Sequence, residues 1–141
     1  MRTDIKFYGA LFIASFIPHL VWEALHIRLY GGYESLSGAL SVPVWAAFGD
    51  ALYTFAAVAA VSLFKKNHRW MVEATWREYI GFALMGFFIA VFVEYKAMIF
   101  GRWFYLDAMP IIPGLSVGLS PIAQMTILLP FSVYIASRAV R

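Results

Sequence analysis

The sequence predicts an all-α integral membrane protein, a four-helix bundle that forms a single domain over residues 1–141. Two observations support this fold class. Hydrophobic residues make up 62% of the chain and charged residues only 13%, which is outside the ordinary composition of soluble domains. Four apolar stretches also have the ~20 residues that a helix needs to cross about 30 Å of hydrocarbon. These stretches are 7–30, 43–64, 79–100 and 115–136. We expect them to be helical because a backbone in lipid must satisfy its own hydrogen bonds.

Most lysines and arginines gather at one end of the predicted bundle, in the two termini and in the loop 65–78. By the positive-inside rule, both termini and this loop are cytoplasmic, and loops 31–42 and 101–114 lie outside. The net charge of +3 is therefore a topology signal and gives no reason to expect a nucleic-acid partner. We expect a multi-pass integral protein of a prokaryotic plasma (inner) membrane.

Loop 65–78 mixes basic residues with Trp70 and Trp76. Indole rings favour the boundary between lipid and water, so we expect both tryptophans to anchor this loop at the interface. Loop 101–114 is rich in aromatic residues and proline, which indicates either an aromatic belt with a rigid turn or a lid over a cavity.

A pair of small residues precedes and opens the last predicted helix. Gly114 and Gly118 have the Gly-x-x-x-Gly spacing that lets two membrane helices approach closely. We therefore expect these two glycines to pack the fourth helix against a neighbour.

Each predicted helix carries one residue with a carboxyl or amide side chain, namely Glu23, Asp50, Glu94 or Gln124. Counting inward at 1.5 Å per residue places Glu23 and Asp50 about 10 Å from the outer ends of their helices. The same count gives about 9 Å for Glu94 and about 13 Å for Gln124. Ionisable groups are rare in hydrocarbon and usually face a bundle interior or a water-filled cavity. A polar layer with one member from every helix therefore predicts a site.

Side chains on the same helix faces extend this layer. His19, Glu23 and His26 follow the spacing i, i+4, i+7, so they form one stripe of the first helix. Carboxyl groups crowded in a medium of low dielectric cannot all ionise, which suits general acid–base catalysis. We predict Glu23, His19, Asp50 and Glu94 as catalytic residues, with Glu23 and His19 as an acid–base pair. The predicted substrate-binding residues are His26, Tyr53, Gln124, Trp22, Trp45, Trp103 and Tyr105.

This chemistry suits an apolar substrate that lies in the membrane. Protonating a carbon–carbon double bond and removing a nearby proton would isomerise or cyclise an isoprenoid or sterol-like lipid. Tryptophan rings such as Trp22, Trp45 and Trp103 could stabilise the intermediate carbocation. We expect a membrane lipid or apolar small molecule as the partner and no cofactor, and a homodimer stays open.

Two other interpretations of the layer remain. Glu23 and His26 have the Glu-x-x-His spacing of carboxylate-bridged metal bundles, with Asp50, Glu94 and His19 as further candidate ligands. The motif occurs once here, and bundles of that kind normally carry it twice. The layer could instead orient a ligand or lock a partner in a lipid- or ligand-binding protein or an accessory subunit without enzymatic activity. The absence of cysteine excludes disulfides and thiolate ligands.

Two short strings resemble a known family. His19-Leu20-Val21-Trp22-Glu23 and Gly49-Asp50-Ala51-Leu52-Tyr53 are similar to segments of the emopamil-binding proteins and sterol Δ8–Δ7 isomerases. That resemblance, over about ten residues, implies proton transfer by a His-x-x-x-Glu pair, here His19 and Glu23, and a further acid. The family typically has five spans rather than four.

The chain as a whole resembles a set of small, functionally uncharacterised four-span prokaryotic membrane proteins. The similarity lies in Trp22-Glu23, Gly49-Asp50, Gly101-Arg102-Trp103-Phe104-Tyr105, Met109-Pro110 and Gly118-Leu119-Ser120-Pro121-Ile122-Ala123-Gln124. It implies that the polar layer is a family feature and implies no activity. The order of these motifs also faintly resembles the membrane lycopene cyclases, whose Pro-x-Glu-Glu ending is replaced here by Pro121-Ile122-Ala123-Gln124.

Overall fold

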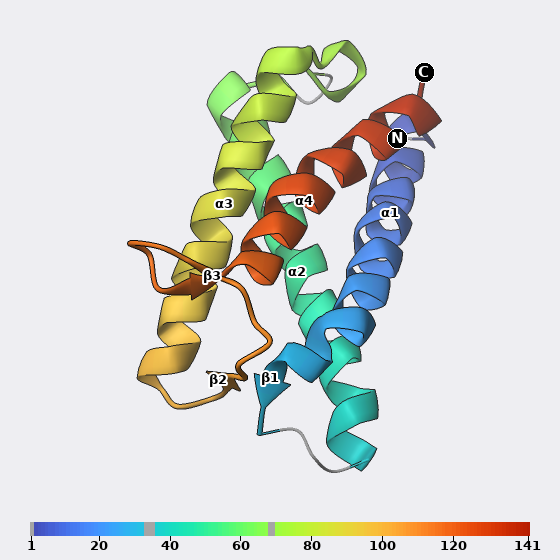
Figure 1. Ribbon diagram of the computed structural model, residues 1–141. Helices are drawn as coiled ribbons and strands as arrows, with labels where there is room; N and C mark the ends of the chain where they lie inside the picture. The colour runs from blue at the N-terminus through green and yellow to red at the C-terminus, as the bar shows by residue number, and fades with distance from the viewer. Residues whose placement is uncertain (1, 33–35, 68–69) are drawn as a thin grey trace.

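Four long helices dominate the computed structural model (Figure 1). It describes the backbone of residues 2–32, 36–67 and 70–141, and the side chains of 5–32, 41–67 and 70–141. The helices are α1 (Arg2–His26), α2 (Leu36–Lys65), α3 (Trp76–Ile99) and α4 (Leu119–Ala139). Each is long and apolar enough to cross a membrane. The prediction of four long apolar helices is confirmed.

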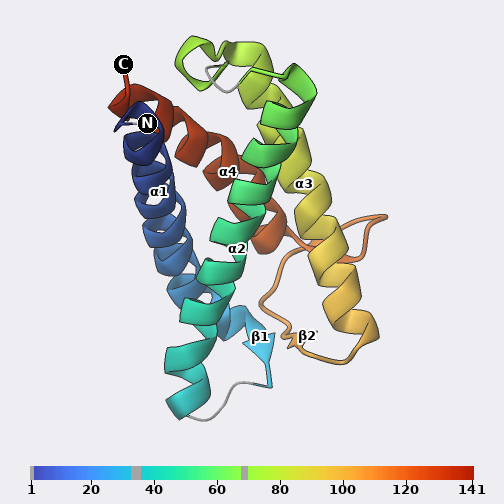
Figure 2. The same ribbon diagram turned by 180° about the vertical axis from the view of Figure 1, so that it is seen from behind.

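The helices pack in the order α2, α1, α4, α3. α4 packs along both α1 and α3, α1 packs along α2, and α2 and α3 contact each other little. Figures 1 and 2 show the two termini side by side at one end of the bundle. The buried apolar core gathers toward that end and includes Phe7, Leu11, Val58, Phe82 and Leu129. The other half of the bundle is thereby left for polar side chains.

Gly86 allows α3 to approach α4 closely. A Cβ atom at this position would lie 2.2 Å from the backbone oxygen of Met125 on α4, so only glycine fits. The prediction that Gly114 and Gly118 pack the fourth helix is wrong, because both residues precede α4. Gly114 has a positive φ of 82° in a turn, and Gly118 packs against Met109.

All four helix starts differ from the predicted boundaries, and α1 and α3 begin at Arg2 and Trp76, ahead of the predicted residues 7 and 79. α2 begins at Leu36, seven residues ahead of Pro43. The prediction of a loop over 31–42 is therefore wrong for residues 36–42, which are helical. The fixed φ of proline is compatible with a helix, and its presence does not force the helix to begin there. α4 begins at Leu119 rather than near residue 115, because the chain just before it forms a strand.

The connections at the end away from the termini form two short antiparallel pairs. After α1, a 3₁₀ turn η1 (Ile27–Leu29) leads into β1 (Tyr30–Gly31), which pairs with β2 (Phe104–Tyr105). β3 (Ile111–Ile112) pairs with β4 (Val117–Gly118). The Leu119 N–H donates to the Pro110 carbonyl at 2.7 Å and joins this segment to α4. Loop 101–114 is therefore tied to both α1 and α4.

The connection between α2 and α3 is partly buried. It contains the 3₁₀ turn η2 (Trp70–Glu73). Trp70 is only 2% exposed, stacks on Phe82 and donates its indole N–H to Ser62 Oγ at 2.8 Å. The prediction of an interfacial indole is therefore wrong for Trp70. Packing the ring in the core removes more of its apolar surface from water than an interfacial position would, and this burial is favourable. Trp76 is 65% exposed.

Candidate active site

A proline sets the register of α1 against α4 next to the polar layer. Pro18 lies inside α1 and cannot donate to the carbonyl four residues earlier, which belongs to Ala14. The hydroxyl of Ser132 on α4 lies 2.9 Å from this carbonyl oxygen and 2.6 Å from the carbonyl oxygen of Leu128. A hydroxyl has one hydrogen, so the two carbonyls share it, and α1 and α4 are in contact one turn from His19.

Gln124 on α4 is at the centre of the polar layer. Its amide nitrogen lies 2.9 Å from Glu23 Oε1 on α1, 2.9 Å from Asp50 Oδ2 on α2 and 3.0 Å from His19 Nδ1. Gln124 is 2% exposed. An amide nitrogen carries two hydrogens, so it can fully serve two of these three neighbours. One side chain therefore links three helices through two carboxyl groups.

His19 supports Asp50 from behind. Its Nδ1 lies 3.1 Å from Asp50 Oδ2, the ring is completely buried, and its Nε2 has no hydrogen-bond partner among the described residues. A buried N–H without an acceptor is costly. The assignment of ring hydrogens that leaves no donor without an acceptor is a neutral His19 ring with its hydrogen on Nδ1, which donates to Asp50. Gln124 then donates to Glu23 and Asp50.

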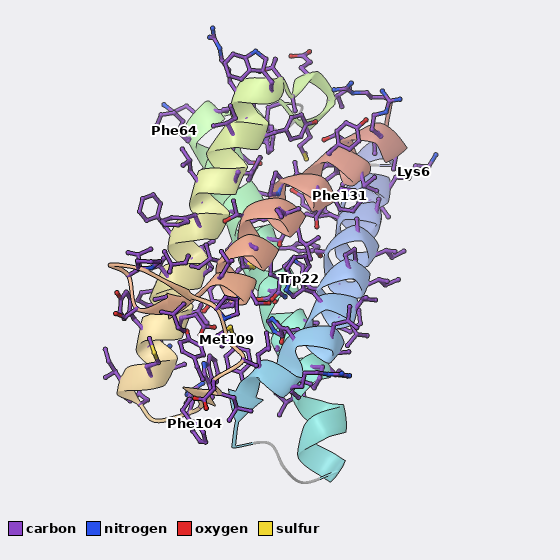
Figure 3. All side chains as sticks on the ribbon, in the orientation of Figure 1. Lys6, Trp22, Phe64, Phe104, Met109 and Phe131 are labelled. Atoms are coloured by element: carbon purple, nitrogen blue, oxygen red, sulfur yellow. The ribbon has the colours of Figure 1, made fainter. Side chains whose placement is uncertain are left out.

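A second chain of hydrogen bonds reaches Glu23 from the other side. Trp22 donates its indole N–H to Ser120 Oγ at 3.1 Å, and Ser120 Oγ lies 2.8 Å from His26 Nδ1. The other ring nitrogen of His26, Nε2, lies 3.0 Å from Glu23 Oε2. Both oxygens of Glu23 are thus hydrogen-bonded. Figure 3 shows Trp22 between α1 and α4, where this chain begins.

Glu94 on α3 forms a separate cluster with aromatic donors. The hydroxyls of Tyr105 and Tyr30 donate to it at 2.6 and 3.3 Å, and the Trp103 indole N–H at 3.2 Å. Burial raises the pKa of Tyr30 and of Tyr105 above the usual value, and the neighbouring Glu94 carboxyl raises both further. Both phenols therefore stay protonated and keep donating. The cluster fastens the β1–β2 pair to α3.

A cavity of about 390 Å³ lies between these two groups of polar residues. This volume is within the range of small-molecule sites, about 300–1,000 Å³. Its walls are mostly apolar and aromatic, with residues from α2 such as Trp45, Gly49 and Tyr53 on one side and Ile89 and Val93 of α3 on the other. Its polar lining residues are Glu23, His26, Asp50, Glu94, Arg102 and Gln124.

Most residues predicted for the site line this cavity. Three do not: His19, Trp22 and Tyr105 lie behind it, and each is hydrogen-bonded to another member of the polar networks. The pairing also differs from the predicted one, because Glu23 pairs with His26 while His19 pairs with Asp50. The predicted residues that line the cavity are Glu23, His26, Trp45, Asp50, Tyr53, Glu94, Trp103 and Gln124.

The structure brings three further residues to the site. Helical spacing places Tyr30 one turn beyond His26 and Ser120 one turn before Gln124, although neither was predicted as a site residue. Arg102 lines the cavity from loop 101–114 together with Trp103. That loop therefore forms part of the cavity wall, as the lid interpretation expects.

The carboxyl and imidazole groups are arranged as hydrogen-bonded pairs. Glu23 and His26 face each other, and so do Asp50 and His19. Among the described residues, no three or more His, Asp or Glu side chains converge as a set that could hold a metal ion. The geometry supplies proton donors and acceptors beside an apolar space.

No family model, curated protein sequence or solved structure matches this chain. The three resemblances stated in the sequence analysis stay predictions.

Proposed function

We propose that this protein is an intramembrane enzyme that isomerises or cyclises an isoprenoid or sterol-like lipid by proton transfer. The observation that carries the proposal is the cavity, an apolar and aromatic space lined by Glu23, Asp50 and Glu94 from three helices. Glu23 and Asp50 keep 14% and 17% of their side-chain surface exposed, although Glu23 is hydrogen-bonded to His26 and Asp50 to His19. They can therefore reach a ligand.

The way into the cavity suits a substrate dissolved in the membrane. The cavity is lined by facing sides of α2 and α3, two helices that contact each other little. Exposed apolar side chains, among them Phe48, Leu52 and Phe92, cover the outer faces of these helices. A lipid tail could pass between α2 and α3 without crossing water.

The aromatic residues of the cavity suit a cationic intermediate. Trp45, Tyr53 and Trp103 line it, and the faces of aromatic rings attract positive charge. Glu94, which receives three hydrogen bonds from neutral donors, is well placed as a carboxylate on the α3 side. A carbocation formed in the cavity would be stabilised by the aromatic rings and by the Glu94 carboxylate.

Energetics favour a functional role over a purely structural one. Hydrogen bonds between membrane helices contribute on average only ~0.6 kcal/mol each. Ionisable groups at membrane depth are expensive and usually mark substrate or proton pathways. Three carboxyl groups around one cavity therefore suggest chemistry rather than a lock between helices.

A second candidate function is lipid or ligand binding without turnover. It is favoured by the hydrogen bonds that Glu23, Asp50 and Glu94 already receive from other side chains. A layer satisfied in this way could orient a head group and do nothing more.

Mass spectrometry of lipids that co-purify with the protein separates these two functions. The enzyme should retain a mixture of substrate and product in the wild type and only the substrate in Glu23→Gln. A binding protein should retain the same lipid in both. Glu73→Gln changes an exposed carboxyl at the termini end and should match the wild type. If no apolar lipid is enriched in any of the three, both functions are refuted.

We also propose that the chain lies in a prokaryotic plasma membrane with both termini in the cytoplasm. The basic residues of the two termini and of loop 65–78 support this orientation. Because the chain has no cysteine, single cysteines can report on it. A membrane-impermeant maleimide added to intact cells should label Asp107→Cys and leave Arg141→Cys unlabelled; the reverse pattern would invert the topology.

A further inference from the structure

The hydrogen bonds around the two carboxyl groups on the α1–α2 side of the cavity are not equivalent. Glu23 receives contacts on both oxygens, from Gln124 on Oε1 and from His26 on Oε2. Among the described residues, Asp50 receives side-chain contacts from His19 and Gln124, both of them on Oδ2. A protonated carboxyl needs one oxygen to carry the hydrogen, whereas an ionised one accepts on both.

The direction of the chain that reaches Glu23 follows when every polar hydrogen in it is given an acceptor. The indole N–H of Trp22 can only donate, so Ser120 Oγ accepts from it. The hydroxyl hydrogen of Ser120 then points to His26 Nδ1, its other described neighbour. With Nδ1 as acceptor, His26 carries its hydrogen on Nε2 and donates to Glu23. Glu23 therefore has donors on both oxygens, the environment of a carboxylate.

The opposite holds for Asp50. His19 donates from Nδ1 and Gln124 from its amide, both to Oδ2. Carboxyl groups that share one donor in low dielectric cannot readily both ionise. The oxygen left to carry a hydrogen is Oδ1, on a side chain that is partly exposed to the cavity it lines.

We propose that Asp50 is the acid and Glu23 the base of this site, and that Ser120 is a positioning residue that enforces this division through the tautomer of His26. The assignment of these steps rests on the proposed function. The Asp50 O–H bond breaks as a C–H bond forms on one carbon of the substrate double bond, which leaves a carbocation. Glu23 then takes a proton from an adjacent carbon, whose C–H electrons form the new double bond. A proton lost from Glu23 to solvent and one gained by Asp50 reset the site.

Infrared spectroscopy tests the division without any need for turnover. The resting protein at neutral pH should show the C=O stretch of a protonated carboxyl group. Labelling the aspartate side-chain carboxyl carbons with ¹³C should shift this band, and labelling those of glutamate should not. Asp50→Asn should abolish it, and Glu23→Gln and the matched Glu94→Gln should keep it. Absence of the band, or a shift on glutamate labelling, would overturn the proposal. The labelling arm uses the wild-type chain, so it decides the assignment even if a variant fails to fold.

The role of Ser120 is tested by nitrogen NMR of ¹⁵N-histidine protein. In the wild type, the His26 signals, assigned by their loss in His26→Gln, should report hydrogen on Nε2 only. Ser120→Ala should produce a mixture of tautomers, and Ser120→Thr, which keeps the hydroxyl, should restore the wild-type pattern. Ser15→Ala removes a buried hydroxyl that bonds only within α1 and should change nothing. An unchanged tautomer in Ser120→Ala would refute the role of Ser120. If all these spectra are as expected but no lipid is converted, the proposed function fails and the proton assignment stands.

Discussion

The amide nitrogen of Gln124 lies 2.9 Å from Oδ2 of Asp50, and this hydrogen bond joins α4 to α2, two helices that otherwise contact each other little. The same nitrogen reaches Glu23 on α1. A single neutral side chain thus holds two carboxyl groups beside the cavity. Its importance can be measured directly.

Replacing Gln124 with leucine should destabilise the protein by about 1–3 kcal/mol, the usual effect of leaving buried polar partners unsatisfied. Thermal or denaturant unfolding in detergent would measure this change. Thr126→Val on the same helix is the matched control, because the Thr126 hydroxyl oxygen is buried without a partner in the described structure. It should be neutral or stabilising. Equal stability of Gln124→Leu and the wild type would show that the bridge contributes nothing.

The fit between α3 and α4 depends on Gly86. Gly86→Ala should destabilise by about 1–3 kcal/mol, since the new methyl group would overlap backbone atoms of Met125 that cannot move aside. Gly81→Ala lies on the same helix, and its methyl group would meet nothing within 4 Å. It should instead stabilise by up to about 1 kcal/mol through helix propensity. Similar unfolding midpoints for the two variants would contradict the close packing.

The two phenols that hold Glu94 should make the protein sensitive to alkaline pH. Their folded-state pKa values are raised above the ordinary value of 10.0, so the folded protein keeps protons that the unfolded chain has lost. Stability should therefore be unaffected by these groups below about pH 10 and should fall as pH rises above it. Unfolding midpoints in detergent across that range would show the slope.

Matched variants of the same cluster isolate this effect. Tyr30→Phe and Tyr105→Phe should each lose less stability at alkaline pH than the wild type. Trp103→Phe removes a hydrogen bond to Glu94 but no titrating group, so its slope should match the wild type. If all four proteins show one slope, the tyrosines do not titrate in the way proposed.

Filling the cavity should block ligand retention and leave the fold intact. Gly49 lines the cavity, and a Cβ there would meet nothing within 4 Å, so Gly49→Leu should direct its side chain into the space. Gly9→Leu is the control, because Gly9 lies on an exposed face of α1 with the same freedom. Co-purifying lipid should fall at least tenfold in Gly49→Leu only, with both melting temperatures near the wild type. Undiminished lipid in Gly49→Leu would place the binding site elsewhere.

Hydrophobicity and depth were enough to predict the four helices and the meeting of Glu23, Asp50 and Gln124. Apolar stretches of this length have one stable form in lipid, and counting residues along an ideal helix gives their depth. The pairing of Glu23 with His26 could not be derived in the same way. It depends on the rotation of α1 against α4, and Ser120 and the freed carbonyl of Ala14 help to set that rotation.

Other features escaped prediction because their cause is tertiary. Trp70 is as aromatic and as close to basic residues as Trp76, and only the presence of Phe82 and Ser62 within reach takes it into the core. Gly86 carries no motif, whereas Gly114 and Gly118 match one. The close helix contact nevertheless falls at Gly86, where α3 and α4 cross.

The central claim, that carboxyl groups around this cavity move protons onto and off a membrane lipid, is tested most directly in deuterated water. Membranes containing the wild-type protein should accumulate an isomerised or cyclised lipid that carries deuterium bound to carbon. Membranes with Glu23→Gln or Asp50→Asn should lose this product at least a hundredfold, while Glu73→Gln should retain it. Wild-type incorporation in both site variants, with folding verified, would contradict the claim.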